Sequence, residues 1–566
     1  MFLQFKSQVT EVLNKALETN NLEIPDLNLE ESMHADIASS VSFRLAPVCK
    51  KSPKVIAEMI AASIKLPEAG LIDRVEITGP YLNFFVNQRF LDKTLSAVRE
   101  QGTDYGSQTG RGKVILEHTS ANPNGPLHVG HIRNSVIGDT LGRILKKAGF
   151  EVENQYYIND MGRQIAIVSW ALGHFDFDKK KKSDHAIADI YIKANRVLEE
   201  QPDKVAEIDV LMQRIEHGDV EVAERFKHAV ELAMDGIKQS LQRINIRHDS
   251  FAWESTFVRN NDVITTIDRI KNTGRAVIDN GALMVELSDY GFEKKLVIQR
   301  SDGTSLYTTR DLAYHLWKAK NCDRMIDVLG ADHKLISSQL KAVLNILGEK
   351  EPEIVIFEFV SLPEGSMSTR RGKFISTDEL LDQIEERAME EVEKRRPDTS
   401  SQFKQDVAKF VGIGAVRYDI IKVSPEKSTM FDWREALDFE KQGAPFIQYS
   451  HARACNILAK AEESGMNMEN LDYDITVLLE DQEIELIKMI GKFSSIIETA
   501  ASELKPHHLA TYSRELADAF NQFYRYVPVL SAEEPLRNSR LVLVDCARTA
   551  LGAALDSLGI FAPENM

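Results

Sequence analysis

Residues 113–134 read KVILEHTSANPNGPLHVGHIRN and contain the turn that decides the fold. The apolar run 114–116 is typical of a buried strand, and a helical pattern of apolar residues begins after the second histidine. His128 and His131 therefore lie where a strand gives way to a helix, whose N-terminus presents unpaired N–H groups and a partial positive charge. Gly130 lets a flat ring or a phosphate approach the backbone closely. The stretch predicts an anion site, suited to adenylate formation, in which the imidazoles donate to phosphate oxygens.

Length and composition predict a globular protein of several domains. A chain of 566 residues is too long for one core, so we expect about three to five domains. Its apolar content of 43% and charged content of 27% fit a soluble protein. The sequence has no apolar run of about 18 residues, so we expect no membrane span. It has no signal-peptide pattern at its start, so we expect a cytoplasmic location.

The cysteines and the net charge restrict the possible binding sites. Cys49, Cys322, Cys455 and Cys546 are scattered without the CxxC spacing of a metal site. We expect reduced core residues, with neither a disulfide framework nor a metal site made by the protein. The net charge of -17 argues against extended nucleic-acid contacts, which need basic surface. Any nucleic-acid surface is therefore expected to be confined to local patches and to depend strongly on salt.

Changes of pattern along the chain predict an α/β protein with five segments. A Rossmann-like parallel sheet that binds a nucleotide is expected in the middle, between an N-terminal α+β module and a C-terminal all-α helical bundle. The expected segments are the N-terminal module at 1–108, the first half of the sheet domain at 109–170, a helical insertion at 171–275, the second half of the sheet domain at 276–380 and the bundle at 381–566.

Local patterns place elements inside these segments. Residues 1–40 and 53–65 carry apolar residues at helical spacing, and residues 75–87 predict two short strands around a Gly-Pro turn. The lysine run 179–182 within the insertion favours a solvated loop over an RNA contact. In the second half of the sheet domain, strands are expected at 276–278, 282–287, 295–299, 324–330 and 355–360.

The turn and its flanks resemble the signature of a known enzyme family. His128-Val-Gly-His131, with Asn122 upstream, resembles the HIGH motif of class I aminoacyl-tRNA synthetases. The segment 117–123, EHTSANP, is similar to the arginyl-tRNA synthetases among them. The resemblance implies that His128, Gly130 and His131 bind ATP and take part in catalysis.

A second segment, Ser366 to Lys373, resembles the KMSKS loop of the same class, which closes over the ATP triphosphate. In the family, cations of this loop neutralise charge on the leaving pyrophosphate. Here Ser366 replaces the first lysine and Arg370 the second. The cation must then come from Arg370, Arg371 or Lys373, of which we favour Arg370 and Lys373 as catalytic residues. The resemblance implies two further ATP contacts, Met367 and Ser368.

A pocket for the amino acid is expected around Glu117, Tyr307 and Asp311. Tyr307 and Asp311 share one face of an expected helix, and Glu117 lies on the strand before the HIGH turn. Two carboxylates and a phenol suit a planar guanidinium, whose donors pair bidentately with carboxylates. The resemblance implies that these three residues bind the arginine side chain and that Asn122 binds its α-amino or carboxylate end. His333 stands where the family often has glutamine, and whether it contacts the substrate is left open.

Other residues match positions at which the family contacts tRNA. Asn83 and Gln88 belong to a segment resembling the module that touches the D-loop at the tRNA elbow. Tyr449, Arg453 and the terminal Met566 resemble the anticodon-binding bundle, where unpaired bases stack on aromatic or guanidinium faces. The structural alternatives are a buried β-hairpin with capping amides in the first case and packing within the bundle in the second.

The resemblance spans essentially the whole chain and implies membership of the arginyl-tRNA synthetases. Such an enzyme uses ATP, Mg²⁺ and L-arginine to form arginyl-adenylate, and then transfers the arginyl group to the terminal ribose of tRNA(Arg). We expect a monomer without a membrane partner. The alternatives are a tRNA-binding paralogue that has lost catalysis and a class I synthetase specific for another amino acid.

Overall fold

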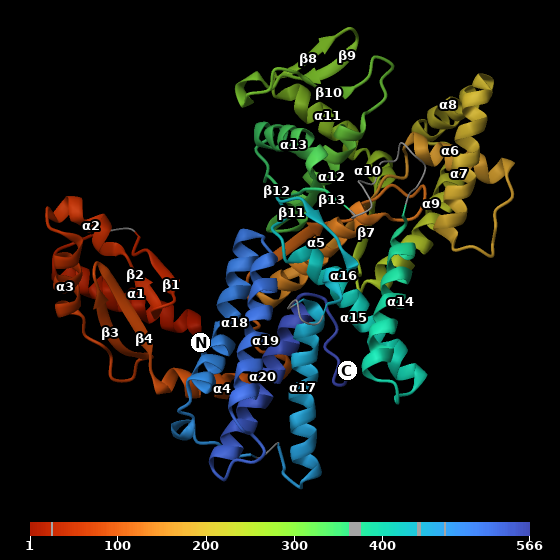
Figure 1. Ribbon diagram of the computed structural model, residues 1–566. Helices are drawn as coiled ribbons and strands as arrows, with labels where there is room; N and C mark the ends of the chain where they lie inside the picture. The colour runs from red at the N-terminus through yellow and green to blue at the C-terminus, as the bar shows by residue number, and fades with distance from the viewer. Residues whose placement is uncertain (24–25, 362–374, 439–442, 469–470) are drawn as a thin grey trace.

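The computed structural model describes residues 1–566 except 24–25, 362–374, 439–442 and 469–470. At its centre lies a five-stranded parallel sheet in the order β12-β11-β5-β6-β7 (Figure 1). The strands are β5 (Lys113–Glu117), β6 (Glu151–Ile158), β7 (Ser250–Trp253), β11 (Arg324–Gly330) and β12 (Glu353–Phe357). The strand order reverses between β5 and β11, so the carboxyl ends of these two strands form a topological switch point. The expected Rossmann-like sheet is confirmed.

Helix α5 (Val129–Lys147) connects the sheet to the rest of the molecule. His128 caps its N-terminus, and two lysines in its last turn complement the negative end of the helix dipole. Residues on every side of the helix are buried, among them Ile132, Val136, Leu141 and Leu145. Because α5 packs against β6 and β11 of the sheet and also against helices of the C-terminal bundle, it belongs to two cores at once.

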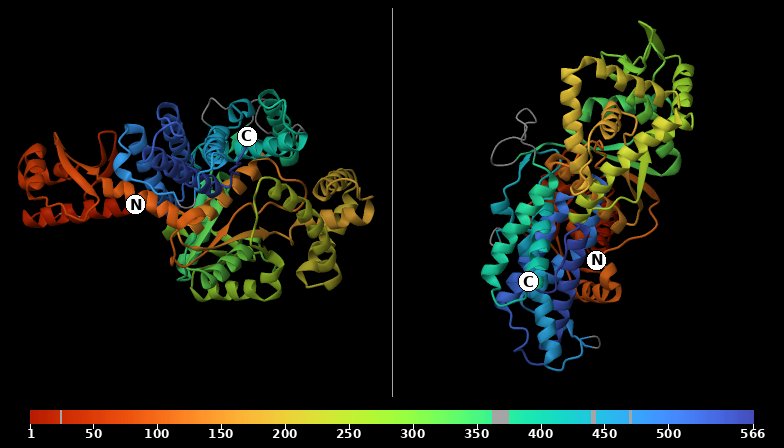
Figure 2. Two further views of the ribbon diagram at one scale, coloured as in Figure 1. Left: turned by 90° about the horizontal axis from the view of Figure 1, so that it is seen from below. Right: turned by 90° about the vertical axis from the view of Figure 1, so that its right-hand side faces the viewer.

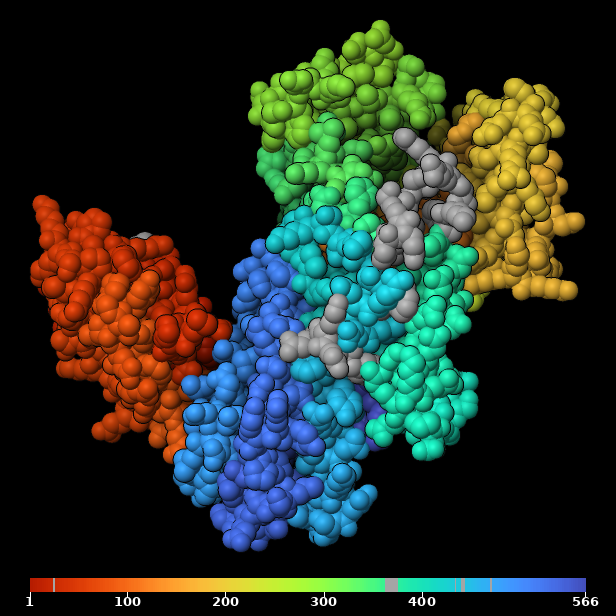
Figure 3. Space-filling view, in the orientation of Figure 1, coloured from red at the N-terminus to blue at the C-terminus, as the bar shows by residue number. Residues whose placement is uncertain are grey.

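The N-terminal module combines helices with a small antiparallel sheet, as expected. Its helices are α1 (Phe2–Thr19), α2 (Val41–Cys49), α3 (Pro53–Ser63) and α4 (Gln88–Gln101), and its sheet has the order β1-β2-β4-β3. The strands are β1 (Leu29–Ser32), β2 (Ala35–Ser39), β3 (Ile72–Thr78) and β4 (Tyr81–Val86). The expectation of helix throughout 1–40 is wrong for β1 and β2, because pairing of β2 with β4 overrides the local spacing. The module extends to one side of the molecule (Figures 1 and 3).

The insertion lies on the opposite side and is mostly, though not wholly, helical (Figure 2). After α6 (Arg163–His174) come α7 (Ser183–Glu200), α8 (Pro202–Glu216), α9 (Val220–Arg243), α10 (Glu254–Arg259) and α11 (Asp262–Asn272). The range 171–275 also contains β7, which forms one edge of the parallel sheet and was not predicted within the helical insertion. The lysine run is solvated at 179–181 as expected, whereas Lys182 is drawn into a polar cluster.

The second half of the sheet domain supplies fewer strands to the parallel sheet than expected. β8 (Ala276–Asp279), β9 (Ala282–Val285) and β10 (Leu296–Gln299) form a separate antiparallel sheet. The cause is local, because Asn280 and Gly281 both have positive φ and turn β8 back onto β9 as a tight hairpin. Of the described strands after β10, only β11 and β12 join the parallel sheet. They are connected by α13 (Lys334–Ile346), and α12 (Tyr307–Asn321) leads into β11.

The C-terminal segment is a helical bundle, as predicted. Its helices are α14 (Thr377–Arg395), α15 (Ser401–Ile421), α16 (Trp433–Ala436), α17 (Ala444–Glu463), α18 (Asp481–Glu503), α19 (His507–Tyr526) and α20 (Leu536–Ser557). A two-residue strand, β14 (Thr429–Met430), pairs with β13 (Val360–Ser361). Among the described residues, no helix combines the length and apolar character needed to cross a membrane.

A buried guanidinium fastens the bundle to the sheet domain. Arg417 of α15 is fully buried and forms an ion pair with Asp139 of α5 at 2.5 Å. It also donates to the carbonyl of Ile244, just after α9, at 2.8 Å and to that of Leu558, just after α20, at 3.0 Å. A Cβ atom at Gly559 would collide with this guanidinium, and the positive φ of Gly559 also requires glycine. Three segments far apart in sequence therefore meet on one side chain.

We expect Arg417→Met to destabilise the chain by about 3–5 kcal/mol, because the Asp139 carboxylate would be left buried without its partner. The measurement is the free energy of unfolding from urea denaturation. The control is Arg163→Met, which removes an exposed pair with Asp209 and should cost about 1 kcal/mol or less. An equal loss of unfolding free energy in the two variants would show that the contact between Arg417 and Asp139 does not hold the domains together.

Candidate functional site

The turn before α5 positions two stacked imidazoles. The ring centroids of His128 and His131 lie 3.6 Å apart. Nδ1 of His128 accepts from the N–H of Gly130 at 3.0 Å, and Nδ1 of His131 accepts from the N–H of His128 at 3.3 Å. Burial lowers the pKa of His128, and burial together with His128 lowers the pKa of His131 to about 3. Both rings are therefore neutral near pH 7, and with Nδ1 accepting, each carries its proton on Nε2.

Gly130 is required by this stacking as well as by the approach of a ligand. A Cβ atom at this position would lie 2.9 Å from Cε1 of His128, closer than such atoms come in proteins. A larger residue would therefore displace the His128 ring from its position over the first turn of α5. Gly130 is expected to let a ligand approach the backbone, and it also fixes the geometry of the two imidazoles.

The chain between β5 and this turn has a strained backbone. Thr119 and Ser120 have φ values of 71° and 39°, in the left-handed region that residues with a Cβ rarely adopt. Asn134 of α5 holds this conformation, since its Oδ1 accepts from the N–H of Thr119 at 2.7 Å while its Nδ2 donates to the carbonyl of Val328 in β11 at 3.0 Å. One amide therefore spans the switch point between β5 and β11 and brings the first turns of α5 to it.

An acidic and basic cluster lies at the same switch point. Glu117 of β5 and Asp327 of β11 are register neighbours in the sheet, and both are buried. Nζ of Lys318 lies between them, 3.0 Å from Oε2 of Glu117 and 2.6 Å from Oδ1 of Asp327. His315 extends the cluster, with Nε2 at 2.8 Å from Asp327 and Nδ1 at 3.1 Å from Oδ1 of Asp311. Lys318, His315 and Asp311 all come from one face of α12.

Electrostatics keep the bases of this cluster protonated. Burial and the nearby Lys318 lower the pKa of His315, but the carboxylates of Asp311 and Asp327 outweigh them and raise it to about 10. Burial lowers the pKa of Lys318, and the carboxylates of Asp327 and Glu117 more than reverse this. Burial raises the pKa of Glu117 although Lys318 opposes it, whereas Lys318 and His315 outweigh burial and hold the pKa of Asp327 well below its usual range. A metal ion bound by Glu117, His315 and Asp327 would need the place that the Lys318 ammonium already takes.

The helical bundle contains a cavity of about 1030 Å³. Tyr449 and Arg453 of α17 line it. The guanidinium of Arg453 lies 4.7 Å from the ring centroid of Tyr449 and 4.5 Å from that of Tyr524. The C-terminal Met566 also lines it, and the carbonyl of Met566 accepts from Arg396. Four arginines line this cavity in an otherwise acidic protein: Arg395, Arg396, Arg453 and Arg525.

Comparisons with protein families agree with this architecture. Residues 94–433 match the catalytic domain of tRNA synthetases class I (R), residues 3–86 the arginyl tRNA synthetase N terminal domain, and residues 447–566 the DALR anticodon binding domain. The chain belongs to the arginyl-tRNA synthetase family. It is 62% identical to the arginine–tRNA ligase of Methanococcoides burtonii and 59% identical to that of Methanosarcina barkeri, over 100% of each chain. The solved arginyl-tRNA synthetase of Thermus thermophilus is 29% identical, with a TM-score of 0.85 over 99% of both chains.

The residues expected to bind arginine gather at the carboxyl edge of the sheet. Glu117 ends β5, and Asp311 reaches the same cluster through His315. Tyr307 begins α12 one turn before Asp311 and is 54% exposed. Asn122 is exposed in the turn before α5. His333, in a short 3₁₀ turn after β11, is also exposed, with Nε2 at 3.7 Å from Asp332.

Four residues expected at the ATP site lie outside the described residues. They are Met367, Ser368, Arg370 and Lys373 of the KMSKS-like segment. The elements on either side of this segment are described, with β13 preceding it and α14 following it. Both are fixed to the region of α5, because Arg133 donates to the carbonyl of Phe359 at 3.0 Å and Leu127 accepts from the N–H of Thr377 at 2.7 Å.

The residues expected at the tRNA elbow differ in exposure. Asn83 of β4 is buried and its Nδ2 donates to Oγ1 of Thr78 at 3.0 Å, although it also borders a hollow of about 340 Å³. Gln88, the first residue of α4, is exposed. Phe84 is fully buried in the core of the module. Of the two amides, Gln88 is the one that a nucleotide could reach without a rearrangement.

The cations behind the acidic pocket are not among the residues predicted from the sequence. Lys318 and His315 follow Asp311 at positions i+7 and i+4, on the helix face that is expected to bind the substrate. Asp327 could have been found as a carboxylate inside the apolar run of β11, where a buried acid requires a partner. Arg133 of α5 is also charged and fully buried, and nothing local in the sequence indicates its role. It donates to the carbonyls of Phe359, Pro425 and Lys427.

The charge of His315 predicts a window of pH-dependent stability. Its folded-state pKa of about 10 lies above the ordinary value of 6.5, so the contribution of the protonated ring is complete below pH 6.5 and is lost as the pH rises through about 10. Measured by urea denaturation from pH 6 to 10, the free energy of unfolding should fall more steeply in the wild type than in His315→Gln. The control His508→Gln, which loses a surface pair with Glu503, should keep the wild-type slope. A wild-type slope in His315→Gln would contradict the charge assignment.

Proposed function

We propose that this arginine–tRNA ligase forms arginyl-adenylate at the carboxyl ends of β5 and β11 and then transfers the arginyl group to the 3′-terminal ribose of tRNA(Arg). One observation carries the proposal, namely that the imidazole turn and the acidic pocket share the switch point. Asn134 links them directly, through the N–H of Thr119 on one side and the carbonyl of Val328, next to Asp327, on the other. A phosphate at the imidazole turn and a guanidinium in the acidic pocket would therefore bind at the same edge of the sheet.

The first turn of α5 supplies the ATP-binding groups in this proposal. His128, Gly130 and His131 present neutral Nε2–H donors and a helix N-terminus, which together favour phosphate oxygens. Met367 and Ser368 would contact the nucleotide. Arg370 and Lys373 would supply cations for the pyrophosphate in place of the family's lysines.

Mg²⁺ enters this proposal as the companion of the ATP phosphates. In the described part of the chain, the two clusters of His and carboxylate ligands each have a lysine ammonium between their carboxylates. The protein groups therefore do not offer a vacant cation cage, and the phosphates themselves would provide the oxygen ligands that Mg²⁺ prefers. When bound, the ion would neutralise charge on the leaving pyrophosphate.

The acidic pocket would hold the side chain of L-arginine. Glu117 and Asp311 each have one side turned to a buried cation and retain lone pairs for the guanidinium, and the phenol of Tyr307 would close the pocket. Asn122 would bind the α-amino or carboxylate end. His333 would contact the substrate from the turn after β11.

The reaction then requires mainly positioning and charge stabilisation. The arginine carboxylate attacks the α-phosphorus of ATP, and pyrophosphate leaves from the opposite side. The hydroxyl of the terminal ribose next attacks the arginyl carbonyl, and AMP leaves. Neither step needs a covalent enzyme intermediate, because alignment of the reactants and donors at the developing charges can supply most of the acceleration.

Two surfaces would bind tRNA. Tyr449, Arg453 and Met566 surround the arginine-lined cavity of the bundle, where unstacked anticodon bases could lie on aromatic and guanidinium faces. Gln88, with Asn83 beside it, would contact the elbow from the N-terminal module. Four arginines line this cavity in an otherwise acidic chain, so binding there should weaken strongly with salt. The proposed enzyme acts as a monomer in the cytoplasm.

The pocket assignment is tested by Asp311→Ala. We expect ATP–pyrophosphate exchange with arginine to fall by at least about 100-fold, because the guanidinium loses a charged partner while tRNA binding is preserved. The control is Asp268→Ala on α11, an exposed acid paired with Lys271, which should retain wild-type activity.

Each of the other outcomes identifies a different error. Retained arginine activation in Asp311→Ala would overturn the pocket. Activation of a different amino acid by the wild type, in a screen of all twenty, would point to a class I synthetase of another specificity. Tight tRNA binding without activation of any amino acid would identify a paralogue that has lost catalysis.

A further inference from the structure

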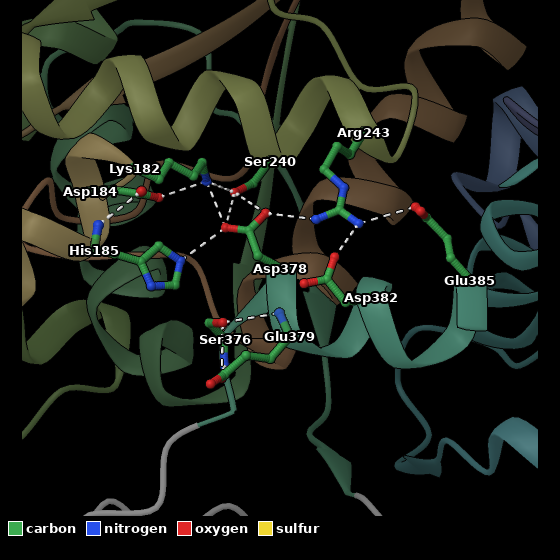
Figure 4. Close-up of polar contacts among 10 residues, drawn as sticks. All are labelled: Lys182, Asp184, His185, Ser240, Arg243, Ser376, Asp378, Glu379, Asp382 and Glu385. Carbon is green, nitrogen blue, oxygen red and sulfur yellow. Dashed lines mark hydrogen bonds and ion pairs between the residues drawn. The ribbon is translucent and has the colours of Figure 1, made fainter. Parts of the chain in front are cut away.

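The first turn of α14 touches the imidazole turn on one side. The N–H of Thr377 donates to the carbonyl of Leu127 at 2.7 Å, and Ser376 forms an isolated antiparallel bridge with His128. These are backbone contacts, so the position of Ser376 and Thr377 fixes where the backbone of His128 lies. The next residue, Asp378, is buried and turns its carboxylate toward the insertion (Figure 4).

Four side chains of the insertion converge on the Asp378 carboxylate (Figure 4). Nζ of Lys182 lies at 2.6 Å, Nε2 of His185 at 3.0 Å and Oγ of Ser240 at 3.1 Å, while Nη1 of Arg243 lies at 3.4 Å. The donors come from the start of α7 and the end of α9, which are separate in sequence. A carboxylate with this many donors has a restricted position, because movement in any direction breaks a charged contact.

The cluster is internally charge-paired. Hydrogen bonds from His185 and Lys182 outweigh burial and hold the pKa of Asp378 well below its usual range, and the bond to Asp378 raises the pKa of His185. Lys182 also pairs with the fully buried Asp184 at 3.0 Å. Its ammonium therefore lies where a metal ion held by Asp184, His185 and Asp378 would have to bind. These contacts indicate a structural joint between elements rather than a metal site.

The insertion end of the cluster is itself fixed to the bundle. Arg243 is the last residue of α9, and the next two residues contact the C-terminal segment. The carbonyl of Ile244 accepts from Arg417 at 2.8 Å, and Nδ2 of Asn245 donates to the carbonyl of Gly559 at 2.9 Å. A continuous set of polar contacts therefore runs from the bundle through the end of α9 to the first turn of α14.

We propose that Asp378 is a positioning residue for the ATP site. It acts through the α14 joint, which consists of Asp378 and its partners Lys182, His185, Ser240 and Arg243. The joint holds Ser376 and Thr377 against Leu127 and His128, so that the position of the insertion and the bundle sets the position of the imidazole turn. This inference rests on the proposed placement of ATP at that turn.

Removal of the carboxylate charge should loosen this contact. With asparagine in place of Asp378, the side chain keeps its shape, but Lys182, His185 and Arg243 would be crowded together with one fewer anion. Their repulsion would shift the first turn of α14 away from α9 and change the position of the His128 ring. Displacements of a fraction of an ångström at such a site cost about tenfold or more in catalytic parameters.

The test compares kinetic constants of the full-length Asp378→Asn variant with those of the wild type in aminoacylation. We expect the KM for ATP to rise about tenfold, with the KM for arginine changed by less than about twofold. A KM for ATP that stays within twofold of the wild type would overturn the proposal. An equal rise in both KM values would also contradict it, because a general loss of structure affects both substrates.

Asp382→Asn is a matched control. Asp382 lies one turn further along α14 and pairs with the same Arg243 at 2.7 Å, but its side chain is 69% exposed and it does not belong to the joint. Its kinetic constants should equal those of the wild type, and a rise in its KM for ATP like that of Asp378→Asn would contradict the assignment. Combining Asp378→Asn with Lys182→Met should give a smaller loss than the product of the two single effects, because both break one contact.

Two further variants separate the possible failures. His128→Asn tests the placement of ATP, and an unchanged KM for ATP in this variant would overturn the proposed function itself. If His128→Asn raises the KM for ATP and Asp378→Asn does not, only the joint is wrong. Should Asp378→Asn fail to fold, His185→Gln removes one half-buried donor and must show a rise in the same direction, and its absence would overturn the proposal.

Discussion

The whole arrangement depends on the position of helix α5. Its N-terminus carries the imidazole turn, its Asn134 joins β5 to β11, its Arg133 holds three carbonyls beyond β12, and its Asp139 pairs with the bundle through Arg417. Each of these polar side chains is buried or half-buried, so each must keep its partners to avoid the cost of desolvation. A single helix is thereby fixed to the sheet, to the end of α9 and to the bundle, and a shift of these parts would move the proposed nucleotide site at its N-terminus.

Buried charge is the means by which the two halves of the site are specified. At the switch point, two register neighbours of a parallel sheet, Glu117 and Asp327, are both acidic, and Lys318 stabilises them. Next to the imidazole turn, Asp378 collects the cations of the insertion. In both places, the ammonium of a lysine takes the position that a metal ion would otherwise occupy. A buried ion pair adds little net stability, but its directional contacts restrict the geometry of its surroundings, which is the property a binding site requires.

Much of this could be predicted from the sequence where short spacings carry the signal. The HIGH turn, the helix at 53–65 and the Tyr307–Asp311 pair follow from contiguous residues, and the structure places all of them as expected on their elements. The strands β8, β9 and β10 lie where the sequence predicts strands, but β7 and the separate sheet of β8–β10 do not follow from it because strand partners are a tertiary property, although Asn280-Gly281 is a hairpin signal. Lys318 and Asp327 carry local signals, a helix face shared with Asp311 and an acid inside an apolar strand, whereas the partners of Asp378 lie more than a hundred residues away in sequence. The lysine run 179–182 predicts a solvated Lys182, and its partner Asp378 lies too far away in sequence to signal otherwise.

The central claim is that the imidazole turn and the acidic pocket form one site for arginyl-adenylate. A crystal structure of the chain with a non-hydrolysable arginyl-adenylate analogue tests it most directly. We expect the guanidinium within hydrogen-bond distance of Glu117 and Asp311, the phosphate against the N-terminus of α5, and Lys318 still between Glu117 and Asp327. A guanidinium bound elsewhere, or a Lys318 side chain displaced from between the two carboxylates, would contradict it.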